Sequence, residues 1–309
     1  MNKLRVYRGA AGLVDKLDSL RVAYDGDTGV IGLSRADDIT YDVTGAFRRR
    51  KGFVRVSSAA CHSLFSCGHY GLCVSNNILC IINPDFSLTS LNVAITGRKV
   101  TYEKTFTGRQ DAIYFSDGNI TGIVSGLVAG PWTALAYVGV QATRTKVQQY
   151  LPEVPAGNKL LIFNGRMYIA KGTMLYCSEV HAFSWFDPLL AYVFDDEITM
   201  LRRVYSGIYV GTNKAVIFLQ GGGPNDFARV QAAAFGAIEG TDVQISALQI
   251  GLENRGDVIL FASSEKGLCL ADDMGMVTSF TNVTVEFPVA NRGSGFIDNN
   301  MQYITTIGD

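Results

Sequence analysis

The densest group of potentially reactive side chains is a run of cysteines and histidines near residue 70. It comprises Cys61, His62, Cys67, His69, Cys73 and, shortly after, Cys80. Thiolate and imidazole are ligands that zinc prefers, but the two-residue spacing that lets a short loop wrap around one ion is absent. The spacing does not match a disulfide framework either. We therefore expect six reduced thiols, most of them small buried strand residues, and neither a metal nor another cofactor.

Adjacent carboxylates are the other candidates for acid–base chemistry. They occur at Asp37-Asp38, Asp195-Asp196-Glu197 and Asp272-Asp273. A glycosidase needs two carboxylates that face each other across a cleft, whereas each of these groups lies beside an expected turn, where Asp caps backbone amides. Sequence motifs of nucleophile elbows, zinc proteases and phosphate-binding loops are missing. His181 lies among aromatic residues and is expected to be packed or capped, so we expect a protein that is not an enzyme.

The elements that position these side chains are predicted by a repeated hairpin pattern. An apolar run ends in a turn signal and is followed at once by a second apolar run, at residues 71–80, 112–120, 166–175, 207–217 and 258–269. Asn-Asn, Asp-Gly and Lys-Gly supply the positive φ that tight hairpin turns require. A period of roughly 40 to 50 residues is typical of β-propeller blades. The pattern therefore predicts an all-β fold built as a single β-propeller.

Composition agrees with a large buried core. Hydrophobic residues make up 48% of the 309 residues and charged residues only 18%, which favours a globular chain. The net charge of −1 argues against a protein whose main task is to grip phosphates. The longest apolar stretch, 127–140, is interrupted by Gly130-Pro131 and is too short to span a bilayer. Residues 1–8 lack the features of a signal peptide, so we expect assembly in a cytoplasm without membrane insertion.

Residues 1–35 differ from the rest and are expected to form an N-terminal extension, with the propeller over 36–309. The spacing of Leu13, Leu17 and Leu20 predicts a short helix, whose apolar face also includes Val14. From residue 36 strands dominate, and the last strand, near 301–307, is expected to close the ring with strands from near the N-terminus. Five hairpin copies, an opening hairpin and a closing strand predict six blades, with five or seven as the alternatives. Residues 137–156 interrupt the repeat as a long connection or insertion.

Several stretches resemble tail nozzle (tail hub) proteins of short-tailed bacteriophages. The opening signature is RADDITYDVTGAFRRRKG at 35–52, followed by HSLF at 62–65. Further matching segments are NGRMYIA at 164–170, LYCSE at 175–179, WFDP at 185–188, ITML at 198–201, GIYVGT at 207–212, VIFLQG at 216–221 and PND at 224–226. The resemblance covers most of the chain from about residue 35. Its motifs are scaffold motifs, so they imply a fold and a role in the virion and no chemical site.

The resemblance implies a structural protein of the virion tail, assembled in the bacterial host cytoplasm. It implies a homohexameric ring below the portal and its adaptor ring, through which double-stranded DNA is ejected. Portal–adaptor ring proteins, and tail fibre or tail tip proteins, are the partners that it implies. The alternative function is a glycan-binding or protein-binding propeller. A propeller glycosidase is less favoured because neither Trp132 nor Trp185 follows the aspartate-box pattern of sialidase-like propellers.

Two segments are candidates for contact with partners. The basic run Arg48, Arg49, Arg50 and Lys51 has three readings: a hairpin arm held by carboxylates of a neighbouring subunit, a lining of the DNA path, or an exposed turn without a partner. We favour the subunit contact over the lining, because a conduit that grips phosphates at every position would slow DNA passage. The apolar face formed by Leu13, Val14, Leu17 and Leu20 is expected to be buried against an adjacent subunit or the ring above.

Overall fold

The structure, a computed structural model, describes residues 10–13, 31–33, 39–41, 47–49, 54–97, 99–107, 110–134, 150–250, 256–281, 285–297 and 303–308. These residues form strands and two short 3-10 helices, η2 (Pro188–Leu190) and η3 (Ala247–Ile250), and no α-helix occurs among them. No helix in this part of the chain has the length and apolarity needed to cross a bilayer. The all-β prediction is confirmed.

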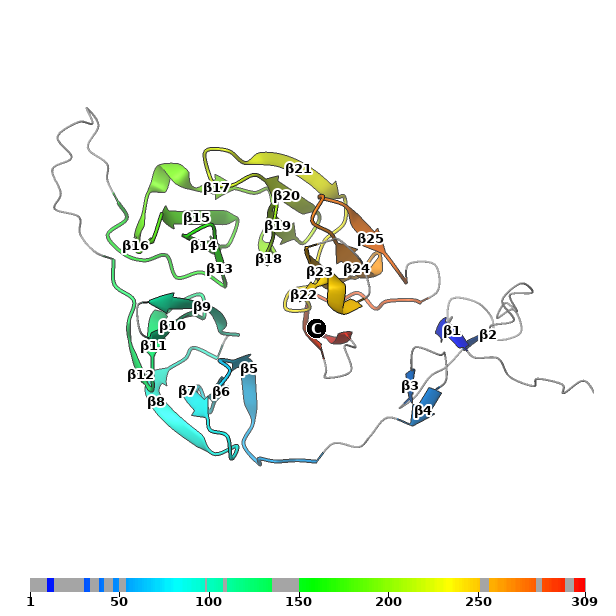
Figure 1. Cartoon of the computed structure of the whole chain (residues 1–309), viewed down its shortest axis with the longest axis horizontal. Coiled ribbons are helices and arrows are strands. Elements are labelled where there is room, and N and C mark those ends of the chain that lie inside the picture. Colours follow the sequence, from blue (N-terminus) through cyan, green and yellow to red (C-terminus); the bar gives the residue numbers. More distant parts are fainter. Residues whose placement is uncertain are drawn as a thin grey trace, which may run out of the picture.

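Five antiparallel sheets follow one another around a ring (Figure 1). Their strands are β5 (Cys61–Ser66), β6 (Gly71–Ser75), β7 (Ile78–Ile82) and β8 (Leu88–Ala94) in blade 1; β9 (Thr101–Thr107), β10 (Gln110–Ser116), β11 (Thr121–Ser125) and β12 (Val128–Pro131) in blade 2; β13 (Lys159–Phe163), β14 (Arg166–Lys171), β15 (Met174–Glu179), β16 (Ala182–Phe186) and β17 (Tyr192–Val193) in blade 3; β18 (Ile198–Val204), β19 (Gly207–Thr212), β20 (Val216–Gln220) and β21 (Ala228–Ala233) in blade 4; and β22 (Val243–Ser246), β23 (Asp257–Ser263), β24 (Gly267–Ala271) and β25 (Val277–Ser279) in blade 5. The first strand of each blade lies nearest the centre, and the chain leaves each blade at its outer edge. The fold is a β-propeller.

The five hairpin copies in the sequence are the second and third strands of these five blades. Their turns use the predicted residues: Asn76 and Asn77 both have positive φ, at 51° and 60°, and Gly118 and Gly172 have φ of 91° and 59°. Positive φ at both central residues is what a two-residue turn needs to match the right-handed twist of its strands. The turn chemistry therefore supports the strand pairing in the middle of blades 1, 2 and 3.

The core is divided into layers between consecutive blades. In β14, Met167 and Ile169 pack against blade 2, whereas Tyr168 and Ala170 pack against blade 4. Successive strand residues point to opposite faces, so a strand covered on both faces is apolar at nearly every position. This explains why the middle strands form continuous apolar runs in place of alternating ones.

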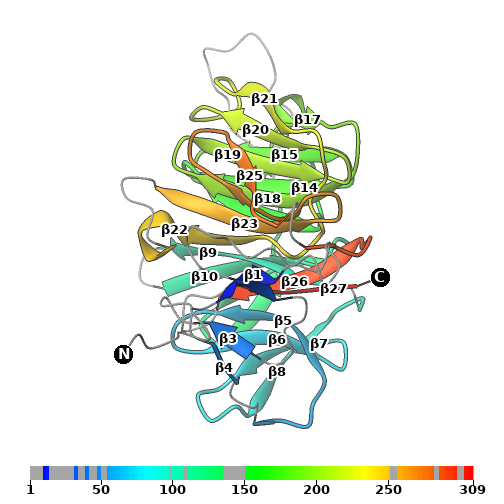
Figure 2. The same ribbon diagram turned by 90° about the vertical axis from the view of Figure 1, so that its right-hand side faces the viewer.

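The sixth position holds only two strands among the described residues. β26 (Arg292–Ile297) and β27 (Tyr303–Gly308) form an antiparallel hairpin between blade 5 and blade 1 (Figure 2). The N-terminal hairpin of β3 (Ile39–Tyr41) and β4 (Phe47–Arg49) is a separate sheet that lies outside the ring (Figure 1). Six blades were expected, and the described strands build five and a part of a sixth.

The prediction of an N-terminal helix is wrong for Leu13, the first leucine of the pattern. Leu13 ends the strand β1 (Ala10–Leu13), which pairs in parallel with β2 (Ile31–Leu33). Three leucines over two turns are too few to specify a helix that short, because strand pairing can override so weak a pattern. Val14, Leu17 and Leu20 lie outside the described residues. Most of the connection expected at 137–156 also lies outside the described residues, because only 150–156 of it are described.

Candidate functional site

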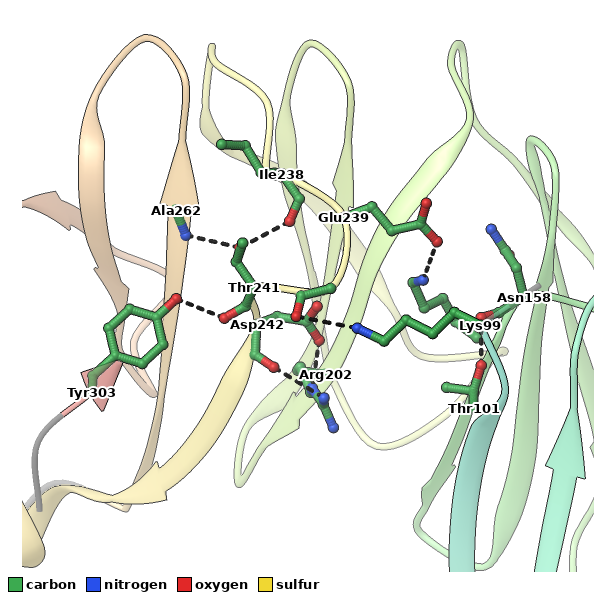
Figure 3. Close-up of polar contacts among 12 residues, drawn as sticks. Lys99, Thr101, Asn158, Arg202, Ile238, Glu239, Thr241, Asp242, Ala262 and Tyr303 are labelled. Atoms are coloured by element: carbon green, nitrogen blue, oxygen red, sulfur yellow. Dashed lines mark hydrogen bonds and ion pairs between the residues drawn. The ribbon is translucent and has the colours of Figure 1, made fainter. Parts of the chain in front are cut away.

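The most connected polar region lies at the centre of the ring. The short segment from Ile238 to Asp242, which joins blade 4 to blade 5, crosses this centre and touches the inner strands of several blades (Figure 3). Its backbone also pairs with the C-terminal hairpin, since the amides of Gly293 and Gly295 donate to the carbonyls of Glu239 and Gly240 at 2.8 and 3.0 Å. The segment therefore links elements that are far apart in the chain.

Charged side chains from blades 3 and 4 bind this segment. The Lys159 ammonium lies 2.5 Å from Glu239 Oε1, and Lys159 is buried although it is a lysine. Arg202 Nε lies 2.6 Å from Asp242 Oδ2, and its Nη2 donates to the Asp242 carbonyl at 3.0 Å. A buried charge is tolerated when it is paired and hydrogen-bonded, and both conditions hold here.

Blade 2 completes the contacts through Lys99, which precedes β9. Its ammonium donates to the Gly240 carbonyl at 3.4 Å. Desolvation lowers the pKa of Lys99, and the Asp242 and Glu239 carboxylates act in the opposite direction. Gly240 has φ +83°, and a Cβ there would meet the Gly293 carbonyl at 2.5 Å, so this position requires glycine.

Thr241 anchors the segment to blade 5 and to the C-terminal hairpin. Its hydroxyl donates to the Ile238 carbonyl at 2.8 Å and accepts the Ala262 amide at 3.0 Å. Its carbonyl accepts the Tyr303 hydroxyl at 2.6 Å. Burial raises the pKa of Tyr303 to about 12, so this phenol remains a hydrogen-bond donor at neutral pH.

The inner strands are also joined directly from blade to blade. Glu103 of blade 2 accepts the Ile162 amide of blade 3 at 3.1 Å, and burial raises the pKa of this carboxyl. Arg203 of blade 4 donates to the Ile162 carbonyl. Charges in this central region are thus used to hold neighbouring blades together. Among the described residues no group of three His, Cys, Asp or Glu side chains is arranged to hold a metal ion.

The sequence did not single out these central residues. Their partners are far away in the chain, 40 residues for Arg202 with Asp242 and 141 residues for Lys99 with Gly240. A lysine that opens a fully apolar inner strand was the available signal, because a buried lysine needs a partner.

The structure describes only two residues of the basic run that the sequence proposed for partner contacts. Arg48 and Arg49 lie in β4, outside the ring, and Arg49 is exposed. Arg50 and Lys51 lie outside the described residues, as do Asp37 and Asp38.

The cysteine group lies on blade 1, and all six cysteines of the chain are thiols. Cys73 and Cys80 are directly opposite one another on β6 and β7. Cys61 lies on the same face, because its cross-strand partner is Ser75, two residues from Cys73. Burial, together with neighbouring Cys61 and Cys80, raises the pKa of Cys73 to about 12. Buried and protonated, Cys73 is a packing residue at neutral pH.

Of the carboxylate groups that the structure describes, Asp272 caps a turn as expected, and the others have different partners. Asp272 accepts the amides of Met274 and Met276 at 2.9 and 3.0 Å. Asp273 accepts the amide of Ser206 at 2.9 Å and so ties blade 5 to blade 4. Asp196 pairs with Lys214 at 2.7 Å. These three carboxylates thus bind backbone amides or a neighbouring cation.

An open cleft of about 590 Å³ lies at the loops of blades 3 and 4 and near the start of blade 5. Its lining includes Asn164, Arg203, Tyr205, Ser206 and Asp257. The Tyr205 side chain is 88% exposed, so an aromatic surface and several polar groups border this space.

Comparisons with known proteins bear on the fold alone. No protein-family model and no curated protein matches the sequence. The extracellular domain of BT4673 from B. thetaiotaomicron superposes with a TM-score of 0.50 at 10% identity, over 82% of this chain and 31% of that one. Virginiamycin B lyase from Staphylococcus aureus superposes with a TM-score of 0.45 at 11% identity, over 81% of this chain and 85% of that one. The chain thus spans about a third of the length of the BT4673 structure. At such identities the likeness says nothing of activity.

Proposed function

We propose that this chain is a structural subunit of a phage tail, one of several copies that form a nozzle around the path of the DNA. The observation that carries the proposal is the basic hairpin β3–β4, which lies outside a propeller whose own centre is already filled. Because this hairpin stands apart from its own ring, it is available for contact with a neighbouring copy of the chain.

The filled centre supports a DNA path that runs outside the single propeller and not through it. Contacts from Lys99, Lys159 and Arg202 meet on the segment from Ile238 to Asp242, so the axis of one chain is crossed by its own backbone. A conduit would therefore run between copies in a ring. A head-to-tail contact between copies closes into such a ring when the rotation per subunit divides the circle evenly.

The segments that resemble nozzle proteins lie at positions that shape the blades. Asn164 and Gly165 form the turn between β13 and β14, with φ of 46° and 72°. Asp187 caps η2 by accepting the Leu189 amide at 2.8 Å. These residues have structural roles in turns and caps, which suits a protein with a structural function.

The mass of the purified protein, measured by light scattering, tests the proposal together with negative-stain images. We expect a ring of six copies with a central opening. Deleting residues 1–34 is expected to leave a folded propeller that no longer joins a tail. A full chain that stays monomeric at micromolar concentration would overturn the proposal.

The second candidate function is a glycan-binding or protein-binding propeller, and the cleft beside Tyr205 is the observation that favours it. Exposed aromatic rings with adjacent polar groups are suited to amphipathic ligands. Screening the protein against a glycan array tests this candidate. Binding that disappears in Tyr205→Ala and persists in Tyr70→Phe, a tyrosine in a loop of blade 1, would support it.

A further inference from the structure

The sixth position of the propeller is incomplete in a specific way. β26 pairs with β27 on one side and contacts β22 of blade 5, whereas no described strand pairs with the other edge of β27. An unpaired edge presents a row of amide and carbonyl groups that favour pairing with another strand. The free edge of β27 can therefore accept a further β-strand.

The chain order identifies the strands that are missing. In every complete blade the chain runs from the inner strand to the outer one and then enters the inner strand of the next blade. β26 and β27 follow β25, the outer strand of blade 5, so they take the first and second places. β3 and β4 precede β5, the inner strand of blade 1, so they match the third and fourth places. This also explains why no sixth copy of the hairpin pattern exists, because its two strands lie at opposite ends of the chain.

The neighbouring blade 1 exposes some apolar side chains on the side where those strands belong. Blade 1 buries Leu72, Val74 and Leu79 completely against blade 2. Its other face buries Cys73 and Cys80 but exposes Leu64 to 69% and Ile78 to 38%. Exposed apolar side chains at this edge are suited to contact with further strands.

The connection between β4 and β5 holds the hairpin away from its own ring. Arg55 donates to the carbonyls of Ser57 and Ser58 at 2.9 and 2.8 Å and so fixes a bend just before β5. Val54 and Val56 on this connection are 86% and 63% exposed. An exposed apolar connection that leads to a detached hairpin is the geometry from which subunits exchange elements.

We propose that the hairpin β3–β4 of one copy pairs with the free edge of β27 in the adjacent copy and completes its sixth blade. The inference rests on the proposed function, because it names the contact that would close the ring of subunits. Each copy gives one hairpin and receives one, so the contact is head-to-tail and no copy keeps an open edge. The hairpin carries Arg48 and Arg49 into the interface, in agreement with the subunit contact favoured for the basic run.

Cross-linking in the full chain tests the exchange. Thr40→Cys in β3 and Thr306→Cys in β27 are combined in a Cys61→Ser background, which removes the exposed native thiol. A bismaleimide that spans a cross-strand pair, about 5 to 8 Å, is added, and the product is analysed on a denaturing gel. We expect a ladder of covalent oligomers in which most chains are linked. The two single-cysteine variants are matched controls and are expected to remain monomeric on the gel.

A second measurement covers the case in which the double variant does not fold. The two single-cysteine chains, carrying different tags, are co-expressed and cross-linked, and we expect a mixed dimer that contains both tags. Peptide mapping that places the link within one chain would overturn the exchange, and so would the absence of a link in folded protein. A six-copy ring with links only within chains would retain the proposed function while it excludes the exchange. A monomer would exclude both.

Discussion

Arg202 and Asp242 join blade 4 to the connection that enters blade 5, with Nε 2.6 Å from the carboxylate and Nη2 3.0 Å from the main-chain carbonyl of the same aspartate. One guanidinium thus fixes both the side chain and the backbone of Asp242. The carboxylate is almost fully buried, with 5% of its side chain exposed, while the Arg202 side chain is 37% exposed.

Replacing Asp242 by Asn is expected to lower the free energy of unfolding by about 1 to 3 kcal/mol, because hydrogen bonds to charged groups contribute on that scale. Urea unfolding of the purified protein measures this change. Lys214→Ala is the matched control, since it breaks an ion pair of similar length, 2.7 Å, whose lysine is exposed. We expect the control to have no measurable effect. Equal losses in both variants would contradict a special role for the central pair.

Gly240→Ala is expected to destabilise the protein by at least about 2 kcal/mol, since a β-carbon there adds a clash with the Gly293 carbonyl to the strain of a positive φ. Gly126→Ala is the control, because Gly126 has φ +59° and nothing within 4 Å of the added carbon. The control is expected to cost about 1 kcal/mol. Thermal unfolding of both variants checks the difference, and an equal cost would show that the centre is not tightly packed.

Asp117 is expected to make stability depend on pH in acid. Burial alone raises the pKa of this carboxyl, but hydrogen bonds from the amides of Ile120, Thr96 and Asn119 and from the Thr96 hydroxyl outweigh burial, and the pKa is lowered from its ordinary 3.8. The ionised carboxylate therefore stabilises the fold above that value, and the stabilisation is lost as the pH falls through the folded-state pKa. Asp117→Asn should show a smaller loss of stability between pH 7 and acid than the wild type. Urea unfolding across this range measures it, with the exposed Asp195→Asn as control; identical slopes for the wild type and Asp117→Asn would refute the assignment.

The thiols are expected to react in two classes. Cys61 is exposed and the other five cysteines are buried, so a thiol reagent should modify one cysteine rapidly in the folded protein and six after denaturation without reductant. Elemental analysis of the same sample is expected to find no stoichiometric zinc. In Cys61→Ser the rapid class should disappear. Fewer than six thiols in denaturant would indicate a disulfide and contradict the expectation.

The sequence predicted the blades well because their information is local. The turn residues Asn76-Asn77 and the apolar runs around them specify a hairpin within ten residues, and the repeat of such hairpins specifies a propeller. The central contacts are not local: Lys99 and Gly240 are brought together only by the closed ring. At the other extreme, Leu13, Leu17 and Leu20 match a helical period over too short a span, and the strand at Leu13 shows that pairing with β2 decides the local structure.

The segment from Ile238 to Asp242 has a consequence for how the molecule unfolds. Blades that touch only their neighbours would behave as a one-dimensional array, in which a terminal unit can open while the rest stays folded. Here a single short connection is bonded to blades 2, 3, 4 and 5 and to the C-terminal hairpin. Opening any one of these elements therefore weakens the connection that all of them share. We expect amide hydrogens in β9, β13 and β18 to exchange with one common opening free energy. The ring would then open as one cooperative unit, and a nascent chain would gain that unit only when its last strands have been made.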